Sequence, residues 1–278
     1  MFSVVLLGSC GQGSQNKDDS EIVETQLPDS LITEDYNNRG NSKLNLKDYY
    51  GAITDYTKAI ELNPDYAVAY NNRGISKNNL KDYYGAIKDY TKAIELNPDY
   101  ASAYNNRGNA KAELKDYYGA IKDYTKAIEI VPDYAAAYFN RGNSKNNLKD
   151  YYGAITDYTK AIELNPDYAP AYNNRGNSKS DLKDYKGAIT DYTKAIELNP
   201  DYAVAYNNRG ISKSDLKDYY GAITDYTKAI SLDPDNAVAY KNRGISKENS
   251  GKPYCSDYKK ACELGNQKSC EWYNNQCN

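Results

Sequence analysis

The sequence of 278 residues contains no histidine. Histidine is the side chain most used for acid–base catalysis near neutral pH, and it is the commonest metal ligand. The sequence also shows no nucleophile paired with a base, no glycine-rich phosphate loop and no cluster of metal-ligating residues. We therefore expect a protein that is not an enzyme and that binds neither a cofactor nor a metal.

The chain has no excess of charge of one sign. It contains 35 Lys and Arg against 38 Asp and Glu, and both signs are interleaved throughout. A nucleic-acid backbone requires a basic face or stripe, and no such pattern is visible. We expect no nucleic-acid partner.

Large aromatic residues other than tyrosine are almost missing, with 2 Phe and 1 Trp against 32 Tyr. Tyrosine must therefore supply much of the core volume. Its hydroxyl group needs water or a hydrogen-bond partner when the ring is buried. This composition favours a thin architecture whose core is never far from solvent.

The sequence is rich in internal repetition. Residues 67–100 read AVAYNNRGISKNNLKDYYGAIKDYTKAIELNPDY, and close copies begin at residues 101, 135, 169 and 203. A more divergent copy begins at residue 33. Positions within each copy are numbered from 1 below, so that Ala67 occupies position 1 of the second copy. Such a period indicates that each copy folds as one supersecondary unit.

Each unit has the pattern of two helices. Tyr83, Ala86 and Tyr90 recur at helical spacing and form one apolar stripe, which predicts a second helix from about residue 83. Residues 67–80 form the expected first helix, and Asp82 is placed to cap the start of the second. The sequence therefore predicts a series of helical hairpins.

The unit resembles the tetratricopeptide repeat (TPR). That family has an aromatic residue at positions 4, 17 and 24, Gly at 8, Ala at 20 and 27 and Pro at 32, and all seven recur in the six copies. The resemblance implies an all-α fold, a right-handed α–α superhelical solenoid of six full repeats followed by a degenerate seventh capping unit in residues 237–278. The expected repeats are residues 33–66, 67–100, 101–134, 135–168, 169–202 and 203–236.

Two charged positions depart from the family pattern in every copy. Position 7, usually a core Leu, is Arg, and we predict an internal ion pair with the Asp at position 23, the alternative being a role in ligand binding. Position 11 is Lys, whose stem we expect to lie over the neighbouring helix in a loosely packed seam. The expected pairs include Arg73 with Asp89, Arg107 with Asp123, and Arg141 with Asp157.

The resemblance implies that the first helices line a concave groove and that positions 5 and 6 contact a ligand. Asparagine dominates both positions, and its amide can pair with the main chain of an extended polypeptide without demanding a particular sequence. The alternative is a solvated surface multiplied by duplication of one unit. The expected groove residues are Asn38, Asn72, Asn106, Asn140, Asn174 and Asn208 at position 6, and Asn71, Asn105, Phe139, Asn173 and Asn207 at position 5.

The N-terminal residues 1–10 resemble a truncated bacterial signal with a lipobox, in which Cys10 would be lipidated. No Lys or Arg precedes the short apolar run, so Cys10 as an ordinary thiol remains the alternative. The run is too short to span a bilayer. We expect residues 11–32 to be a flexible tether.

The other four cysteines are confined to the C-terminal unit. Cys255 and Cys262 are seven residues apart, as are Cys270 and Cys277, with a turn signal at Gly265 between the pairs. A helical hairpin would place Cys262 opposite Cys270 and Cys255 opposite Cys277, which predicts two disulfides. Free thiols and zinc are the alternatives. The segment also resembles the cysteine-rich solenoid repeats related to TPRs, which implies a stapled end cap.

These features together predict a location for the protein and a kind of partner. Disulfides and a lipobox both point to an extracytoplasmic lipoprotein anchored to a membrane through Cys10, in the bacterial periplasm or at the cell surface, with the cytoplasm as the alternative. We expect a monomer that binds a protein or peptide. The alternative function is a structural envelope factor that associates with itself.

Overall fold

The computed structural model describes residues 29–277, which are all-helical apart from short turns. The helices alternate between the first and second helices of the repeats, as the periodicity predicts. The first helices are α1 (Asp29–Asn45), α3 (Ala67–Asn79), α5 (Ala101–Glu113), α7 (Ala135–Asn147), α9 (Ala169–Asp181), α11 (Ala203–Asp215) and α13 (Ala237–Asn249). The second helices are α2 (Tyr49–Leu62), α4 (Tyr83–Leu96), α6 (Tyr117–Ile130), α8 (Tyr151–Leu164), α10 (Tyr185–Leu198), α12 (Tyr219–Leu232) and α14 (Cys255–Glu263), and α15 (Gln267–Gln276) follows.

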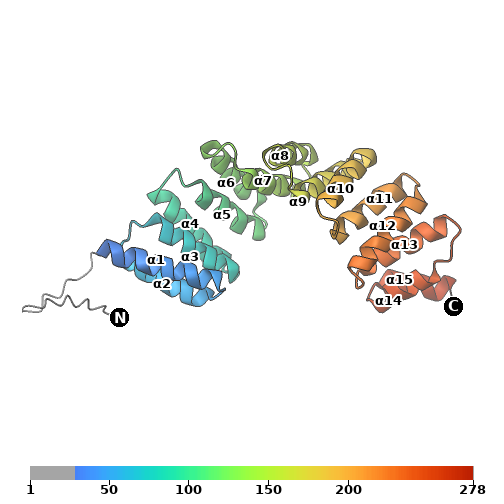
Figure 1. The fold of residues 1–278 in the computed structure, drawn as a ribbon, viewed down its shortest axis with the longest axis horizontal. Helices are drawn as coiled ribbons and strands as arrows, with labels where there is room; N and C mark the ends of the chain where they lie inside the picture. Colours follow the sequence, from blue (N-terminus) through green and yellow to red (C-terminus); the bar gives the residue numbers. More distant parts are fainter. Residues whose placement is uncertain (1–28, 278) are drawn as a thin grey trace, which may run out of the picture.

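The hairpins stack side by side into a curved row, with α1 at one end and α15 at the other (Figure 1). Each helix packs against the next one along the chain. Successive first helices also approach one another, from α1 with α3 to α11 with α13. The first helices of successive repeats lie closer together than the second helices do, so the first helices line the inner side of the curve. The expected superhelical solenoid is confirmed.

Close packing within a hairpin requires glycine at position 8. In the second repeat, a Cβ atom built on Gly74 would lie 2.6 Å from Cε1 of Tyr90, so any side chain there would clash with the ring. Tyr90 itself is buried. Each hairpin is therefore held together by a tyrosine ring lying on a glycine, which explains how tyrosine fills this core.

The turn inside each hairpin is short and has one strained residue. Lys81 adopts the left-handed conformation with φ of 63°, and the N–H of Asp82 donates to the carbonyl of Lys77 at 2.9 Å. This is the arrangement that usually ends a helix with glycine. The Asp82 carboxylate then accepts from the N–H of Gly85 at 2.9 Å, which confirms the predicted cap of the second helix.

Helix bounds differ from the sequence-based expectation at the N-terminal end. The first helix begins at Asp29, so residues 29–32 belong to α1 and not to the expected tether. In the second repeat, α3 ends at Asn79, one residue before the expected Leu80. Cys10 and residues 11–28 lie outside the described residues.

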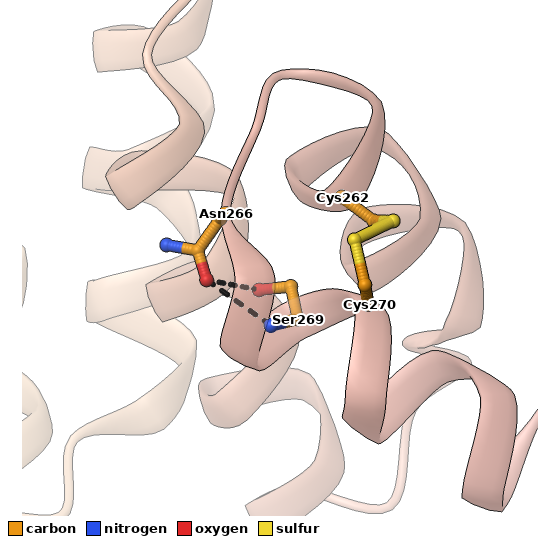
Figure 2. Close-up of a disulfide and its surroundings, with 4 residues drawn as sticks. All are labelled: Cys262, Asn266, Ser269 and Cys270. Atoms are coloured by element: carbon orange, nitrogen blue, oxygen red, sulfur yellow. Dashed lines mark hydrogen bonds between the residues drawn. A yellow bond between two sulfur atoms is a disulfide. The ribbon is translucent and has the colours of Figure 1, made fainter.

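The C-terminal unit closes the stack with a hairpin held by two disulfides. The Cα atoms of Cys255 and Cys277 are 5.7 Å apart, and those of Cys262 and Cys270 are 4.6 Å apart. Figure 2 shows the second bridge beside the start of α15, where Asn266 caps the helix by accepting from the N–H and hydroxyl of Ser269. The hairpin thus has the same cysteine pairs that the spacing predicts.

Aromatic rings fill the space between the disulfide-bonded hairpin and the turn before it. The Trp272 ring stacks on Tyr258 at 4.5 Å between centroids, and Tyr254 meets Trp272 edge-on at 5.3 Å.

Among residues 29–277, no helix is both long and apolar enough to cross a membrane.

Candidate functional site

Each hairpin contains a buried carboxylate held by two cations. In the second repeat, Asp89 accepts from Nε and Nη2 of Arg73 at 2.9 and 2.7 Å. The Nζ atom of Lys77 lies 2.7 Å from Oδ2 of the same carboxylate. Arg73 and Asp89 are therefore in contact as the sequence predicts, and Lys77 completes a three-residue ionic cluster.

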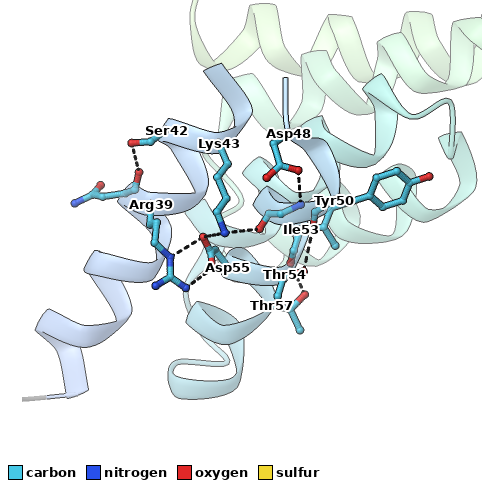
Figure 3. Close-up of polar contacts among 11 residues, drawn as sticks. Arg39, Ser42, Lys43, Asp48, Tyr50, Ile53, Thr54, Asp55 and Thr57 are labelled. Atoms are coloured by element: carbon cyan, nitrogen blue, oxygen red, sulfur yellow. Dashed lines mark hydrogen bonds and ion pairs between the residues drawn. The ribbon is translucent and has the colours of Figure 1, made fainter. Parts of the chain in front are cut away.

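The first repeat shows the same cluster in Figure 3, where Arg39 and Lys43 converge on Asp55. Asp55 is almost fully buried. The hydrogen bonds from the Arg39 guanidinium lower the pKa of the Asp55 carboxyl, despite the opposing effect of its burial. The other clusters are Arg107 and Lys111 with Asp123, Arg141 and Lys145 with Asp157, Arg175 and Lys179 with Asp191, Arg209 and Lys213 with Asp225, and Arg243 and Lys247 with Asp257.

The arginine of each cluster also links its repeat to the one before. Nη1 of Arg73 donates to the hydroxyl of Thr57 at 3.2 Å, and the guanidinium lies over the Tyr70 ring at 5.4 Å. Arg73 thus donates three hydrogen bonds inside the protein, and its side chain is only 17% exposed. The geometry therefore favours the structural role of these arginines over the alternative role in ligand binding.

The lysine at position 11 corrects one expectation. We expected the stem of Lys77 to cover the neighbouring helix in a loose seam, but its ammonium pairs with Asp89. The physical reason is that each carboxylate oxygen can accept more than one hydrogen bond, so Oδ2 of Asp89, which accepts from Nε of Arg73, also binds Lys77. The repeated Lys at a fixed distance from the Asp was the sequence signal for this contact.

The asparagines form a hydrogen-bonded chain between repeats, which we call the asparagine ladder. Nδ2 of Asn140, at position 6, donates to Oδ1 of Asn105 at 3.2 Å and to Oδ1 of Asn109 at 3.0 Å in the preceding repeat. The Tyr124 hydroxyl donates to the same Asn109 oxygen at 2.9 Å. Equivalent position-6 donors are Asn72, Asn106, Asn174 and Asn208.

Because of the asparagine ladder, the position-5 residues are less exposed than the predicted groove requires. Asn71, Asn105 and Asn173 at position 5 are buried, with 3 to 6% of each residue exposed, because they lie between successive first helices. Phe139 packs against the Tyr168 ring at 4.8 Å. These four residues do not form an open groove floor as we expected, and Asn207 is also largely covered. The sequence could not show this, since the bonds join residues in different repeats.

The position-6 asparagines keep part of their bonding capacity on the inner side. They are partly exposed in repeats 2 to 6, and Asn38 is exposed. Within residues 29–277, no donor reaches Oδ1 of Asn106 or Asn140, although their Nδ2 atoms donate in the ladder. The two amides therefore retain an acceptor for a bound molecule.

A cavity of about 620 Å³ opens on the same side, between α3, α5, α6 and α7. Its walls are mainly polar and include Asn109, Asn140, Asn143 and Asn147. The arrangement can offer hydrogen bonds to a ligand.

Over residues 29–277 no group of His, Cys, Asp and Glu is arranged to hold a metal ion.

Comparison with known proteins identifies the fold family. The family model described as tetratricopeptide repeat matches residues 34–66, 67–100, 101–134, 135–168, 169–202 and 203–236. No sequence among the curated proteins compared with this chain matches it.

Three solved structures illustrate the similarity. YrrB, titled a TPR protein with an unusual peptide-binding site, has 25% identity and a TM-score of 0.58 over 67% of this chain and 96% of its own. MamA has 27% identity and a TM-score of 0.56 over 61% and 94%. Pseudomonas aeruginosa pilF has 19% identity and a TM-score of 0.68 over 77% and 96%, a likeness of fold alone. With family matches over most of its length, the chain belongs to the tetratricopeptide repeat family.

Proposed function

We propose that the chain is a protein-interaction scaffold that binds an extended polypeptide along the inner side of the solenoid. The observation that carries the proposal is the pair of free acceptors, Oδ1 of Asn106 and of Asn140, of which Asn140 lines the polar cavity on that side. Main-chain N–H groups of an extended peptide would satisfy such acceptors. The similarity to YrrB, whose title describes a peptide-binding site, supports the same function.

A peptide-binding experiment tests the proposal. A library of extended peptides is screened against the purified chain, and the affinity of the best binder is measured for Asn106→Ala with Asn140→Ala. We expect a loss of about tenfold or more, which corresponds to 1.4 kcal/mol. Lys122→Ala on α6, which is exposed and lies on a second helix, is the matched control.

The stability of the double variant must be measured alongside its affinity. Asn140 also donates within the ladder, and each lost bond costs about 1 kcal/mol of folding free energy. Thermal unfolding followed by circular dichroism shows whether the helices remain intact at the assay temperature. An unchanged affinity in a folded variant would contradict binding through these amides.

We infer that this scaffold works outside the cytoplasm. Two disulfides are typical of proteins in an oxidising compartment, and both cysteine pairs of the C-terminal hairpin are bonded. The lipobox-like residues before Cys10 would add a lipid anchor. Metabolic labelling of the full chain with a radioactive fatty acid tests the anchor, and Cys10→Ser should abolish the label and release the protein from membranes.

Self-association is a second candidate function because tyrosines form an exposed row at position 18. Tyr84, Tyr118 and Tyr152 are each about three-quarters exposed, and Lys186 stands at this position in the fifth repeat. Light scattering separates the candidates. A monomer favours the scaffold, whereas an oligomer that dissociates when these tyrosines are changed to Lys, as in the fifth repeat, favours self-association.

A further inference from the structure

The junction between the second and third repeats lacks a side-chain hydrogen bond that is present between the fourth and fifth repeats. Between the fourth and fifth repeats, the hydroxyl of Ser178 donates to Oδ1 of Asn146 at 2.8 Å. The corresponding residues between the second and third repeats are Ala110 and Asn78. Alanine cannot donate, and Oδ1 of Asn78 is buried with no hydrogen-bond partner anywhere in residues 29–277.

A second alanine opens space next to this oxygen. Ala112 occupies position 12 of the third repeat, where the adjacent repeats have Asn78 and Asn146. The cavity of about 620 Å³ lies here, and both Ala112 and Asn78 line it. At positions 10 and 12 the third repeat therefore has methyl groups where the fourth repeat has Ser144 and Asn146.

The cavity has an acidic side chain that the nearest structural cations do not neutralise. Glu113 lines it, and its Oε2 accepts only a long hydrogen bond of 3.4 Å from the Tyr83 hydroxyl. Arg107 and Lys111 on the same helix are both bonded to Asp123. Lys115 also lines the cavity but forms no ion pair with any described residue, Glu113 included. An acidic group thus remains available to a ligand.

Two aromatic rings complete the walls. Tyr117 and Tyr124 both line the cavity, and the Tyr124 hydroxyl is used by Asn109 in the ladder. The faces of tyrosine rings attract cations, and they also pack against aliphatic chains. The site therefore combines a carboxylate, a buried acceptor and tyrosine rings with the ammonium of Lys115. The first three favour a ligand that has a cation on an aliphatic stem.

We propose that this cavity, which we call the basic subsite, binds a lysine or arginine side chain of the polypeptide held on the inner side. The ammonium or guanidinium group donates to Glu113 and to Oδ1 of Asn78, and its stem packs on Tyr117. This inference rests on the proposed binding of a polypeptide, and it adds the class of residue that is recognised.

Peptides of defined charge test the basic subsite. Fluorescent peptides with blocked ends, in which alanine alternates with lysine, asparagine or glutamate, are titrated against the full chain and followed by anisotropy. We expect the lysine peptide to bind at least about tenfold more tightly than the asparagine peptide, and the glutamate peptide to bind most weakly.

Three variants remove separate parts of the subsite. Glu113→Gln removes the charge, Ala112→Asn fills the space, and Ala110→Ser supplies the missing donor to Asn78; each should reduce the preference for lysine by about fivefold to tenfold. Ala112→Asn and Ala110→Ser introduce residues that neighbouring repeats already have at these positions, so the fold tolerates them. The matched control is Glu129→Gln, whose exposed carboxylate pairs with Lys126 on α6.

Each outcome decides between the two proposals. Equal binding of the lysine and asparagine peptides, unchanged by Glu113→Gln, would overturn the basic subsite and leave the polypeptide-binding proposal intact. Failure of all three peptides to bind would overturn both. A preference for lysine that Glu129→Gln abolishes as strongly as Glu113→Gln would place recognition elsewhere and would also overturn the subsite.

Discussion

At the scale of single residues, the charges at positions 7, 11 and 23 act inside the solenoid. Asp123 is buried, while the side chains of Arg107 and Lys111 are 17 and 20% exposed. Burying a carboxylate is unfavourable unless cations and hydrogen bonds compensate for its lost hydration. The same arginine bonds to Thr91 of the preceding repeat at 3.1 Å, so one side chain stabilises both the hairpin and its junction.

Removing the carboxylate should be more damaging than removing one cation. We predict that Asp123→Asn lowers the free energy of unfolding by about 3 kcal/mol, because two partly buried cations then face each other without an anion. Arg107→Met should cost less, since Lys111 still pairs with Asp123. Urea unfolding followed by circular dichroism measures both, with the exposed Glu129→Gln as a control expected below about 0.5 kcal/mol. Equal losses in all three variants would contradict the prediction.

A second residue-scale prediction concerns the left-handed turn residue. Lys149 has φ of 63°, a conformation that costs residues with a Cβ about 1 kcal/mol and glycine almost nothing. We predict that Lys149→Gly raises the free energy of unfolding by roughly 0.5 kcal/mol or more, after the greater flexibility of glycine in the unfolded chain is subtracted. Lys149→Ala retains the Cβ and should give no gain. A loss of stability in the glycine variant would count against strain at this turn.

At the scale of elements, the C-terminal hairpin is the part of the fold that depends most on covalent bonds. Helices α14 and α15 have only 9 and 10 residues, which is too short to be stable in isolation. The Asp257 carboxylate joins the hairpin to α13 through Arg243, in a copy of the ionic cluster. The hairpin therefore behaves as an end cap that covers the last repeat.

Loss of one bridge should unfold this cap locally. We predict that Cys255→Ser with Cys277→Ser lowers the stability of α14 and α15 by about 2 to 4 kcal/mol, since the bridge closes a long loop of the unfolded chain. Hydrogen exchange measured by mass spectrometry should rise in these two helices. Helices α3 and α4, far along the stack, serve as the internal reference, and equal exchange changes there would contradict a local role.

At the scale of the whole molecule, the repeated tyrosines predict sensitivity to alkali. Burial raises the pKa of Tyr56 to about 12, and burial raises the pKa of the equivalent Tyr90, Tyr124, Tyr158 and Tyr192 as well. A tyrosine whose pKa is higher in the folded protein than in the unfolded chain stabilises the folded state at pH values below the unfolded pKa, which is near 10. That stabilisation is lost as the pH rises through the folded value.

We therefore predict cooperative unfolding above about pH 10, with the unfolding midpoint between the unfolded and folded tyrosine pKa values. Tyrosinate absorbance should rise in two phases. The second phase should come from the buried rings, which should ionise together with the loss of helical circular dichroism. A single tyrosinate phase that precedes unfolding would contradict the burial of these hydroxyl groups.

Acid should act through a different group. The folded pKa of Asp55 is lowered by its hydrogen bonds from Arg39, so its contribution is present above the unfolded pKa near 4 and is lost as the pH falls through the folded value. Stability should accordingly decline below about pH 4 in a titration followed by urea unfolding. Asp55→Asn should flatten this decline, whereas a variant of an exposed residue such as Glu61→Gln should not.

The sequence by itself determined the period, the two helices of each hairpin, the Asp82 cap and the pairing partners of the cysteines. These features depend on residues close together in the chain, where helical spacing and turn chemistry fix the geometry. The pairing of Arg73 with Asp89 also lies within one hairpin. It could therefore be inferred from position alone.

Only the tertiary structure decided how the asparagines are used. Whether Asn105 faces solvent or accepts a hydrogen bond inside the ladder depends on how closely α5 and α7 approach, and on contacts between residues a full repeat apart. The same holds for the space beside Ala112. A repeated sequence fixes each unit, but the distance and rotation between units determine which side chains remain free for a partner.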